Sequence, residues 1–516
     1  MGENSRITIA DFHSRKMRRS YIPTIGLSLL AIAAGTWVFF TACSKNQVKS
    51  GLICISDQAG LTPSPRSSSV PPSSIARSPN SQSSQPVPSG RVESDLPADL
   101  AQRFSRGDRV LFRGDGSSDR DDGVSAFKKA DYQKAILAFN RAVESSRNDP
   151  EPQIYLNNAL ARQKGTPYTL AVIVPVDNRA DVAKEMLRGV ADSQTRFNEA
   201  SSKDGRLVEI LIVNDANDSV VAGSVADQLA KMPEVLGVIG HNSSEATLEA
   251  LPKYEQAGLA VISPTSTSTK LKGSTFFRTV PSDAASGQTL ADYAATQAVK
   301  QVVIFFDSKS PYSQSLKEAF SSSFAEVGGK VVSSIDLSDP ELEPKAAIEK
   351  LDSNIKTALL FPSIQTIPRA ISIARANAAA GTRMRLMGGD SLYDSRTLIN
   401  GGDAIANLVL AVPWFSEPDS DYGQKANIRW GGRINWRTAS SFDAAQALID
   451  TLAEPVSRQQ VLQGLRSLKL PETETAGASL QFESTGDRME DPLLVQAIEG
   501  GNRPEGAKFG FELISP

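Results

Sequence analysis

From residue 168 onward the chain alternates short apolar segments with amphipathic ones. Typical apolar segments are TLAVIVPV at 169–176, LVEILIVND at 207–215 and QVVIFFD at 301–307. Strands that are apolar on both faces and separated by helices predict parallel sheets covered by helices on both sides. The region is too long for one such sheet, so we predict an α/β fold with two doubly wound parallel sheets joined by a hinge. Further predicted strands are 235–240, 259–264, 330–337, 357–362 and 406–414.

Composition excludes several function classes. The 516 residues include 55 Lys and Arg against 58 Asp and Glu, a net charge of -3 that disfavours a dedicated nucleic-acid binder. Two Cys and two His cannot form a Cys/His zinc cluster in the main body. The chain has no G-x-S-x-G, P-loop or H-E-x-x-H motif, and His241 and Ser243 are too close in sequence to face each other as base and nucleophile. We therefore expect a protein that is not an enzyme and has no metal or cofactor.

The first 43 residues predict attachment to a membrane. Basic residues within 15–19 precede an uncharged segment, 21–43, which is long enough to cross a bilayer as one helix with its basic end in the cytoplasm. The sequence Phe40-Thr41-Ala42-Cys43 also resembles a bacterial lipobox, so an uncleaved signal anchor and a lipoprotein signal both remain open. Either one would tether the protein to the inner membrane of a bacterial cell envelope, with the main domain in the periplasm or extracytoplasmic space.

Two segments separate this anchor from the α/β region. Residues 44–98 are rich in Ser and Pro and poor in large apolar side chains, which predicts a disordered linker. Residues 99–165 have helical spacing, and YQKAILAFNRA at 132–142 resembles part of a tetratricopeptide repeat. Only about one and a half repeats are visible, whereas stacked repeats normally need three or more. This helical module is therefore either a layer packed on its neighbour or a docking site for a protein partner.

Hydroxyl-rich loops follow two neighbouring predicted strands. Residues 240–244 read GHNSS, and residues 263–268 read SPTSTS. Hydroxyl groups, backbone N–H groups and the start of a helix together favour a carboxylate. Tyr312 and Asp390, from the second predicted lobe, could bind an α-ammonium group. The sequence therefore predicts a clamp for a small zwitterion between the lobes, at the carboxyl ends of the strands.

Six segments occur in an order and spacing that together are informative. They are 240–267, FRTVPSD at 277–283, SPYSQSL at 310–316, LMGGDSLYD at 386–394, SFDAAQALID at 441–450 and ASLQFESTGDR at 478–488. In these segments the chain resembles the type I periplasmic binding proteins, in the branch of the leucine/isoleucine/valine-binding proteins. The resemblance implies a binding-protein domain over 166–516. Its lobe 1 would comprise about 166–281 and 415–487, and its lobe 2 about 282–414 and 488–516.

The resemblance also implies which residues bind the ligand. Ser244 matches the family's carboxylate-binding serine, Tyr312 would cover the ligand, and Asp390 would bind its ammonium group. Thr265 and Thr267 would bind the amino and carboxylate groups through a backbone carbonyl, a hydroxyl and an N–H. The full implied set is Ser243, Ser244, Thr265, Thr267, Tyr312, Asp390 and Phe442, with no catalytic and no metal-binding residue.

Each of these residues also has a simpler interpretation. The serine pair could cap the following helix, Thr265 could belong to an ordinary polar loop, and Tyr312 could pack at a helix start. Asp390 could likewise be a helix cap. The loop VDNR at 176–179 departs from the family's pattern, and its charged residues would favour a more polar ligand.

Three function classes follow from these implications. The first is an extracytoplasmic solute-binding protein that captures an amino acid or a similar small polar solute for the permease of an ABC transporter. The second is a membrane-tethered sensor that uses the same cleft and signals to a protein partner through the helical module. The third is a scaffold whose cleft has lost its ligand.

Overall fold

In the computed structural model, all the described residues belong to one compact unit within 87–516. The predicted membrane segment, 1–43, and the predicted linker, 44–98 apart from its last residue, lie outside the described residues. Among the helices that the structure describes, none combines the length and apolar character needed to cross a bilayer. The described residues are 98–114, 117–200, 205–380, 383–416, 420–454 and 456–514.

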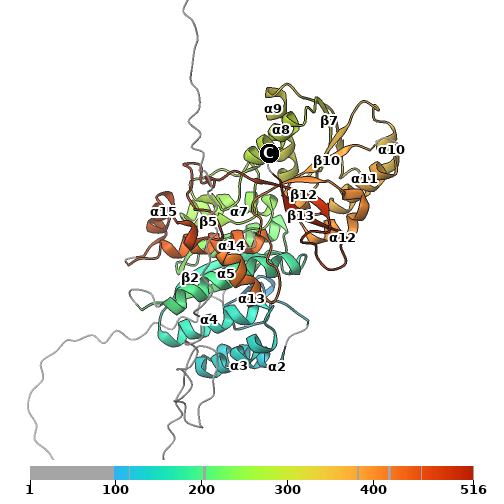
Figure 1. Ribbon diagram of the computed structural model, residues 1–516. Coiled ribbons are helices and arrows are strands. Elements are labelled where there is room, and N and C mark those ends of the chain that lie inside the picture. Colours follow the sequence, from blue (N-terminus) through green and yellow to red (C-terminus); the bar gives the residue numbers. More distant parts are fainter. Residues whose placement is uncertain are drawn as a thin grey trace, which may run out of the picture. The chain divides into compact units, whose positions relative to one another are not determined.

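Lobe 1 is built on a six-stranded sheet within the described residues, in the order β1-β3-β2-β4-β5-β6 (Figure 1). Strands β2 to β6 are parallel, and β2, β3 and β4 are buried along their whole length, as expected for strands covered on both faces. The strands are β1 (Phe104–Ser105), β2 (Tyr168–Val174), β3 (Val208–Asn214), β4 (Val235–Ile239), β5 (Ala260–Ser263) and β6 (Phe276–Arg278). The helices are α5 (Ala180–Ala200), α6 (Ser219–Ala230), α7 (Ser244–Ala257), α13 (Asp421–Trp430), α14 (Trp436–Asp450) and α15 (Arg458–Arg466).

Lobe 2 is built on a seven-stranded sheet, counted over the part of the chain that is described, in the order β13-β12-β11-β10-β9-β7-β8. Strands β7 to β11 are parallel, whereas β12 and β13 are antiparallel. The strands are β7 (Gln301–Phe306), β8 (Lys330–Asp336), β9 (Thr357–Phe361), β10 (Arg385–Gly388), β11 (Val409–Val412), β12 (Leu493–Glu499) and β13 (Phe509–Leu513). The helices are α8 (Asp283–Thr296), α9 (Pro311–Glu326), α10 (Pro344–Glu349), α11 (Ile367–Ala379) and α12 (Ser395–Gly401). The short 3-10 helices η2 (Asp390–Leu392) and η3 (Gly402–Ile405) also belong to lobe 2, whereas η4 (Glu472–Glu474) lies in lobe 1.

The predicted two-lobed α/β fold is confirmed, with one difference in the sheets. Both sheets are mixed, because β1 pairs antiparallel with β3 and the hairpin β12–β13 pairs antiparallel with β11. A hairpin requires antiparallel strands, since only these can be joined by a short turn. The lobes have separate hydrophobic cores, and the chain passes between them after β6, after β11 and before β12.

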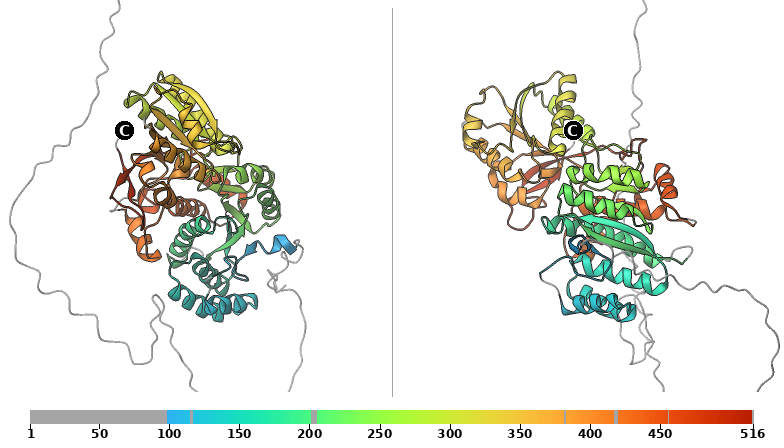
Figure 2. Two further views of the ribbon diagram at one scale, coloured as in Figure 1. Left: turned by 90° about the vertical axis from the view of Figure 1, so that its right-hand side faces the viewer. Right: turned by 180° about the vertical axis from the view of Figure 1, so that it is seen from behind.

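The segment before β2 packs on lobe 1. Helices α2 (Ser118–Lys128), α3 (Tyr132–Ser145) and α4 (Pro150–Lys164) stack in succession, and α4 packs on α5 (Figure 2). The four-residue helix α1 (Ala98–Ala101) precedes β1. The sequence predicts an all-helical module here, but Phe104 and Ser105 form β1 at the edge of the sheet. Two residues are too short an apolar run to be recognised as a strand from their pattern.

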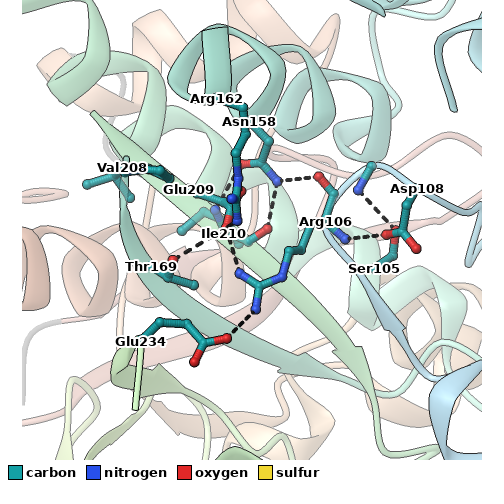
Figure 3. Close-up of polar contacts among 12 residues, drawn as sticks. Ser105, Arg106, Asp108, Asn158, Arg162, Thr169, Val208, Glu209, Ile210 and Glu234 are labelled. Carbon is teal, nitrogen blue, oxygen red and sulfur yellow. Dashed lines mark hydrogen bonds and ion pairs between the residues drawn. The ribbon is translucent and has the colours of Figure 1, made fainter. Parts of the chain in front are cut away.

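Buried polar contacts join this segment to β3 (Figure 3). Glu209 of β3 is fully buried, and its Oε1 lies 2.6 Å from Nη1 of Arg106 and 2.6 Å from Nη2 of Arg162. Asn158 of α4 donates from Nδ2 to the carbonyl of Ile210 at 2.8 Å and accepts from the Ile210 N–H at 2.8 Å. These are the contacts that a neighbouring strand would supply. The segment is therefore an integral part of the edge of lobe 1.

Candidate ligand-binding cleft

A cavity lies where loops at the carboxyl ends of strands from both lobes come together. Its volume is about 50 Å³, well below the roughly 300–1,000 Å³ of pockets that enclose a small-molecule ligand. The cavity in this arrangement of the lobes is therefore too small to enclose a small-molecule ligand. Lobe 1 contributes Asn217, Asn242, Ser243, Ser244, Glu245, Thr265, Trp436 and Arg437. Lobe 2 contributes Ser310, Tyr312, Ser363, Ile364, Gln365, Asp390 and Ser391.

The lobe 1 wall is formed by the loops after β4 and β5. Ser243 is the N-cap of α7, and its Oγ accepts from the Ala246 N–H at 3.2 Å, so the capping interpretation is confirmed. Thr265 donates from Oγ1 to the carbonyl of Asn242 at 2.8 Å, which ties the two loops together. Within the described residues, Ser244 makes one long bond, in which its Oγ accepts from the Ser268 N–H at 3.4 Å. The proton of the Ser244 hydroxyl is thus available to a ligand, whereas Thr265 already donates its own.

A buried triad supports this wall from below. Nδ1 of His241 lies 2.8 Å from Oδ2 of Asp215, and its Nε2 lies 2.9 Å from the hydroxyl of Tyr254. The backbone carbonyl of His241 accepts from Oγ of Ser263 at 2.9 Å. Since all four side chains are fully buried, they fix the path of the loop that leads to the serine pair.

The lobe 2 wall centres on a carboxylate held by a phenol. Tyr312, at the start of α9, donates from its hydroxyl to Oδ1 of Asp390 at 2.8 Å, and the Ser391 N–H donates to the same hydroxyl at 3.3 Å. Burial raises the pKa of Asp390, while the Tyr312 hydrogen bond and the charge of Arg437 act in the opposite direction. Burial likewise raises the pKa of Tyr312, so its hydroxyl remains a donor. A carboxylate oriented in this way suits an ammonium group.

Two predicted binding residues do not line the cavity. Phe442 is 3% exposed and stacks on Tyr422, with 4.1 Å between ring centroids, in a small apolar cluster. It lies more than one helical turn beyond the start of α14, on a face that packs inside lobe 1. Thr267 is also buried, and its carbonyl accepts from the Asp283 N–H at 2.8 Å while its hydroxyl makes no hydrogen bond within the described residues. The other five predicted residues come together as expected.

The sequence-based prediction missed the contribution of α14. Its first two residues, Trp436 and Arg437, line the cavity, and its N-cap Asn435 accepts from the Arg437 N–H at 2.9 Å. The only signal in the sequence was an Asn before a helical segment, a common capping pattern that says nothing about a ligand. Asn217, Glu245, Ile364 and Gln365 were missed as well, although each follows a predicted strand end closely.

Two α/β lobes that enclose a polar cavity between their strand ends define a two-lobed solute-binding fold. A family model described as "Periplasmic binding protein" matches residues 167–502, and the chain belongs to this family.

Curated relatives and solved structures agree with this assignment. An amino acid binding protein of Pseudomonas aeruginosa is 24% identical over 226 residues, which are 43% of this chain and 60% of that protein. The Leu/Ile/Val-binding protein of Escherichia coli is 21% identical over 342 residues, 64% of this chain and 90% of that protein. The chain thus spans about 60% of the length of the first curated relatives it matches.

The structural neighbours share the fold. A leucine binding protein of Thermotoga maritima has a TM-score of 0.57 at 21% identity, over 67% of this chain and 97% of that one. An ABC transporter substrate-binding protein of Desulfitobacterium hafniense in complex with Leu has a TM-score of 0.56 at 20% identity, over 67% of this chain and all of the other. The similarity covers the two lobes.

Proposed function

We propose that this chain is an extracytoplasmic solute-binding protein that captures an amino acid or a similar small polar solute and delivers it to an ABC-type membrane importer. The observation that carries the proposal is the placement of Ser244 and Asp390 on opposite lobes of one cavity. Relatives named as amino acid and Leu/Ile/Val-binding proteins support an amino acid as the solute. The apolar segment at 21–43 would hold the protein at the membrane that carries the importer.

The chemistry of the two walls suits a zwitterion. The hydroxyl of Ser244 and the backbone N–H groups at the start of α7 are placed to donate to a carboxylate, and the helix dipole adds to this attraction. Asp390, oriented by Tyr312, is placed to accept from the ammonium group. Closure of the lobes removes water from both ends, which strengthens each interaction. Binding in this account involves no bond formation or cleavage.

Calorimetric titration of the full-length protein with a panel of amino acids tests the binding. We expect one or more to bind, and we expect Ser244→Ala and Asp390→Asn each to weaken that binding about tenfold or more, since a hydrogen bond to a charged group contributes about 1.5–3 kcal/mol. Matched controls on α6 are Ser224→Ala and Asp227→Asn, because both residues are exposed and outside the cavity. Unchanged affinity in both cleft variants would refute the clamp.

A tethered sensor is the second candidate function, and one observation favours it. Helix α4 of the N-terminal segment packs on α5, and Asp181 at the start of α5 forms an ion pair with lobe 2. Closure of the lobes would therefore act on α5 and, through it, change the position of the helical segment and of a protein partner docked there. Deletion of the gene distinguishes the two candidates, because loss of solute uptake favours the carrier and intact uptake favours the sensor.

A further inference from the structure

Two adjacent side chains at the start of α14 present donors without acceptors. Within the described residues, Nε1 of Trp436 and Nε of Arg437 are buried and make no hydrogen bond. The two residues are only 2% and 4% exposed, and both line the cavity between the lobes. Buried donors are almost always paired, because an unpaired one loses the hydrogen bond that it makes to water in the unfolded chain. Two such donors at one wall of a ligand cavity indicate that an acceptor from the ligand belongs there.

Among the described residues, Arg437 shares its ion-pair partner with Arg179. Its Nη1 lies 3.9 Å from Oδ2 of Asp394, the same oxygen that lies 3.9 Å from Nη2 of Arg179. Asp394 is further engaged by Arg396, whose Nε lies 3.2 Å from its Oδ1. Asp390 also faces the guanidinium but already accepts from Tyr312. Burying a guanidinium is costly unless a closely bonded anion compensates it, and none of these contacts is close.

Neighbouring carboxylates are engaged elsewhere. Glu185 faces the guanidinium from α5, but it pairs with Arg188 and accepts from Oγ1 of Thr438 at 2.6 Å. Glu245, the other carboxylate in the lining, is influenced by Asp307 across the cleft, and burial and that charge raise its pKa. The described residues therefore supply no carboxylate that bonds closely to the guanidinium of Arg437.

The rest of the lining is also polar. Asn242 donates from Nδ2 to Oδ1 of Asn217 at 3.2 Å, and Gln365 and Ser363 face them from lobe 2. Ile364 is the one aliphatic side chain among the described lining residues. A branched aliphatic side chain would leave the polar side chains of this lining without hydrogen-bond partners from the ligand.

We propose that the cleft takes an acidic amino acid or a related solute that carries a second carboxylate, and that Arg437 and Nε1 of Trp436 bind this second group. The inference rests on the proposed function, in which Ser244 and Asp390 bind the α-carboxylate and the ammonium group. The second carboxylate satisfies both orphan donors and neutralises the guanidinium at once. The specificity thus differs from that of the relatives named for leucine, isoleucine and valine.

Titration of the full-length protein with L-glutamate, L-aspartate, their amides and L-leucine tests the proposal. We expect at least one of the acids to bind about tenfold or more tightly than its own amide and than leucine, because a charged hydrogen bond contributes about 1.5–3 kcal/mol. Arg437→Gln should abolish this preference for acid over amide. Trp436→Phe keeps an aromatic ring and removes the donor, so it should weaken acid binding by a smaller factor, and a melting temperature measured in parallel separates this loss from the loss of buried volume.

The control variant is Arg147→Gln, since Arg147 is exposed between α3 and α4 and lies outside the cavity; it should behave like the wild type. Equal or tighter binding of leucine or of the amides by the wild type overturns the second-carboxylate site but leaves the proposed function standing. Absence of binding of every amino acid by folded wild-type protein refutes both. The wild-type preference decides the matter even if Arg437→Gln does not fold.

Discussion

Nη2 of Arg396 in lobe 2 lies 3.3 Å from Oδ2 of Asp181 in lobe 1, so an ion pair bridges the two lobes beside the cavity. In a weaker contact the base is in lobe 1 and the acid in lobe 2, with 3.9 Å between Nη2 of Arg179 and Oδ2 of Asp394. Each lobe thus contributes one acid and one base, and the acid and base within each lobe are also paired at 3.2 Å. This four-residue cluster, which we call the interlobe cluster, favours the closed arrangement of the lobes.

Breaking the interlobe cluster should weaken solute binding modestly. Asp181 and Arg396 are both about half exposed, and exposed pairs contribute about 0.2–1 kcal/mol. We therefore expect Asp181→Asn or Arg396→Gln to lower affinity by a factor of about 1.4–5 at low salt and by less at high salt. The exchanged pair Asp181→Arg with Arg396→Asp should not recover the loss, because it places like charges beside Arg179 and Asp394, the partners within each lobe. Titration at two salt concentrations measures this, and identical affinities at low salt would contradict it.

The buried carboxylate of Glu209 should matter far more for stability. Replacing Glu209 with Gln removes the fully buried charge that pairs with both Arg106 and Arg162, whose side chains are themselves largely buried. Breaking a buried pair in this way costs about 3–5 kcal/mol. Urea denaturation should show that loss, whereas Glu234→Gln is a matched control that removes only the partly exposed partner of Arg106 and should cost about 1 kcal/mol or less. Equal effects of the two variants would show that Glu209 is not the anchor.

Acidification should stabilise the protein through Glu151. This carboxylate is fully buried in α4, and burial raises its pKa from 4.5 to about 7. Between about pH 4.5 and 7 the folded chain therefore binds a proton that the unfolded chain releases, so this contribution is present below that range and is lost as pH rises through about 7. Asp283, with a pKa of about 7 from burial, acts in the same direction. Melting temperatures measured across this range should fall as pH rises.

Two variants show whether Glu151 and Asp283 cause the fall in melting temperature with rising pH. Glu151→Gln should flatten the fall in melting temperature, because a neutral side chain can still accept from the Leu111 N–H that now donates to Oε1 at 2.6 Å. Asp283→Asn should flatten it independently, since the two groups lie in different lobes. A slope that is unchanged in both variants would mean that neither group titrates in this range.

The sequence predicted those elements of the fold whose own residues carry a recognisable pattern. Strands such as β2 and β3 are continuous apolar runs, because both faces are buried, and such runs can be recognised by themselves. Strand β10 was missed because its four residues begin with an exposed Arg385, and β12 because exposed and buried residues intermingle along it. Both segments form strands because they pair with neighbouring strands in the sheet, and their own residue pattern does not indicate it.

The same distinction explains the site. Ser244 could be found because it closely follows a predicted strand, and the ends of parallel strands meet at one edge. Asp390 was found from the resemblance of the segment LMGGDSLYD at 386–394, since the strand before it, β10, was not predicted. Phe442 and Arg437 lie on one helix, and which of them faces the cavity depends on how α14 is rotated and placed against α5. That placement is a tertiary contact between segments far apart in the sequence, and no local pattern encodes it.

Gly189 of α5 is the residue that sets this contact. A Cβ at this position would overlap the carbonyl oxygen of Thr438 and lie 2.6 Å from the backbone nitrogen of Phe442, so only a glycine lets α14 approach this closely. Gly189→Ala must push α14 outward, and overpacking of this kind costs about 1–3 kcal/mol. Because Trp436 and Arg437 begin the same helix, the variant should also lose affinity for the solute.

The control for this prediction is Gly432→Ala, since a Cβ there would meet no atom within 4 Å. It should keep the stability and affinity of the wild type in urea denaturation and calorimetric titration. Gly189→Ala should fall below it in both measurements, and the loss of affinity should exceed what partial unfolding explains, because the displaced helix carries cavity-lining residues. If Gly189→Ala matched the control in stability, α14 would have room to spare against α5, and the position of Arg437 in the cavity would not depend on that contact.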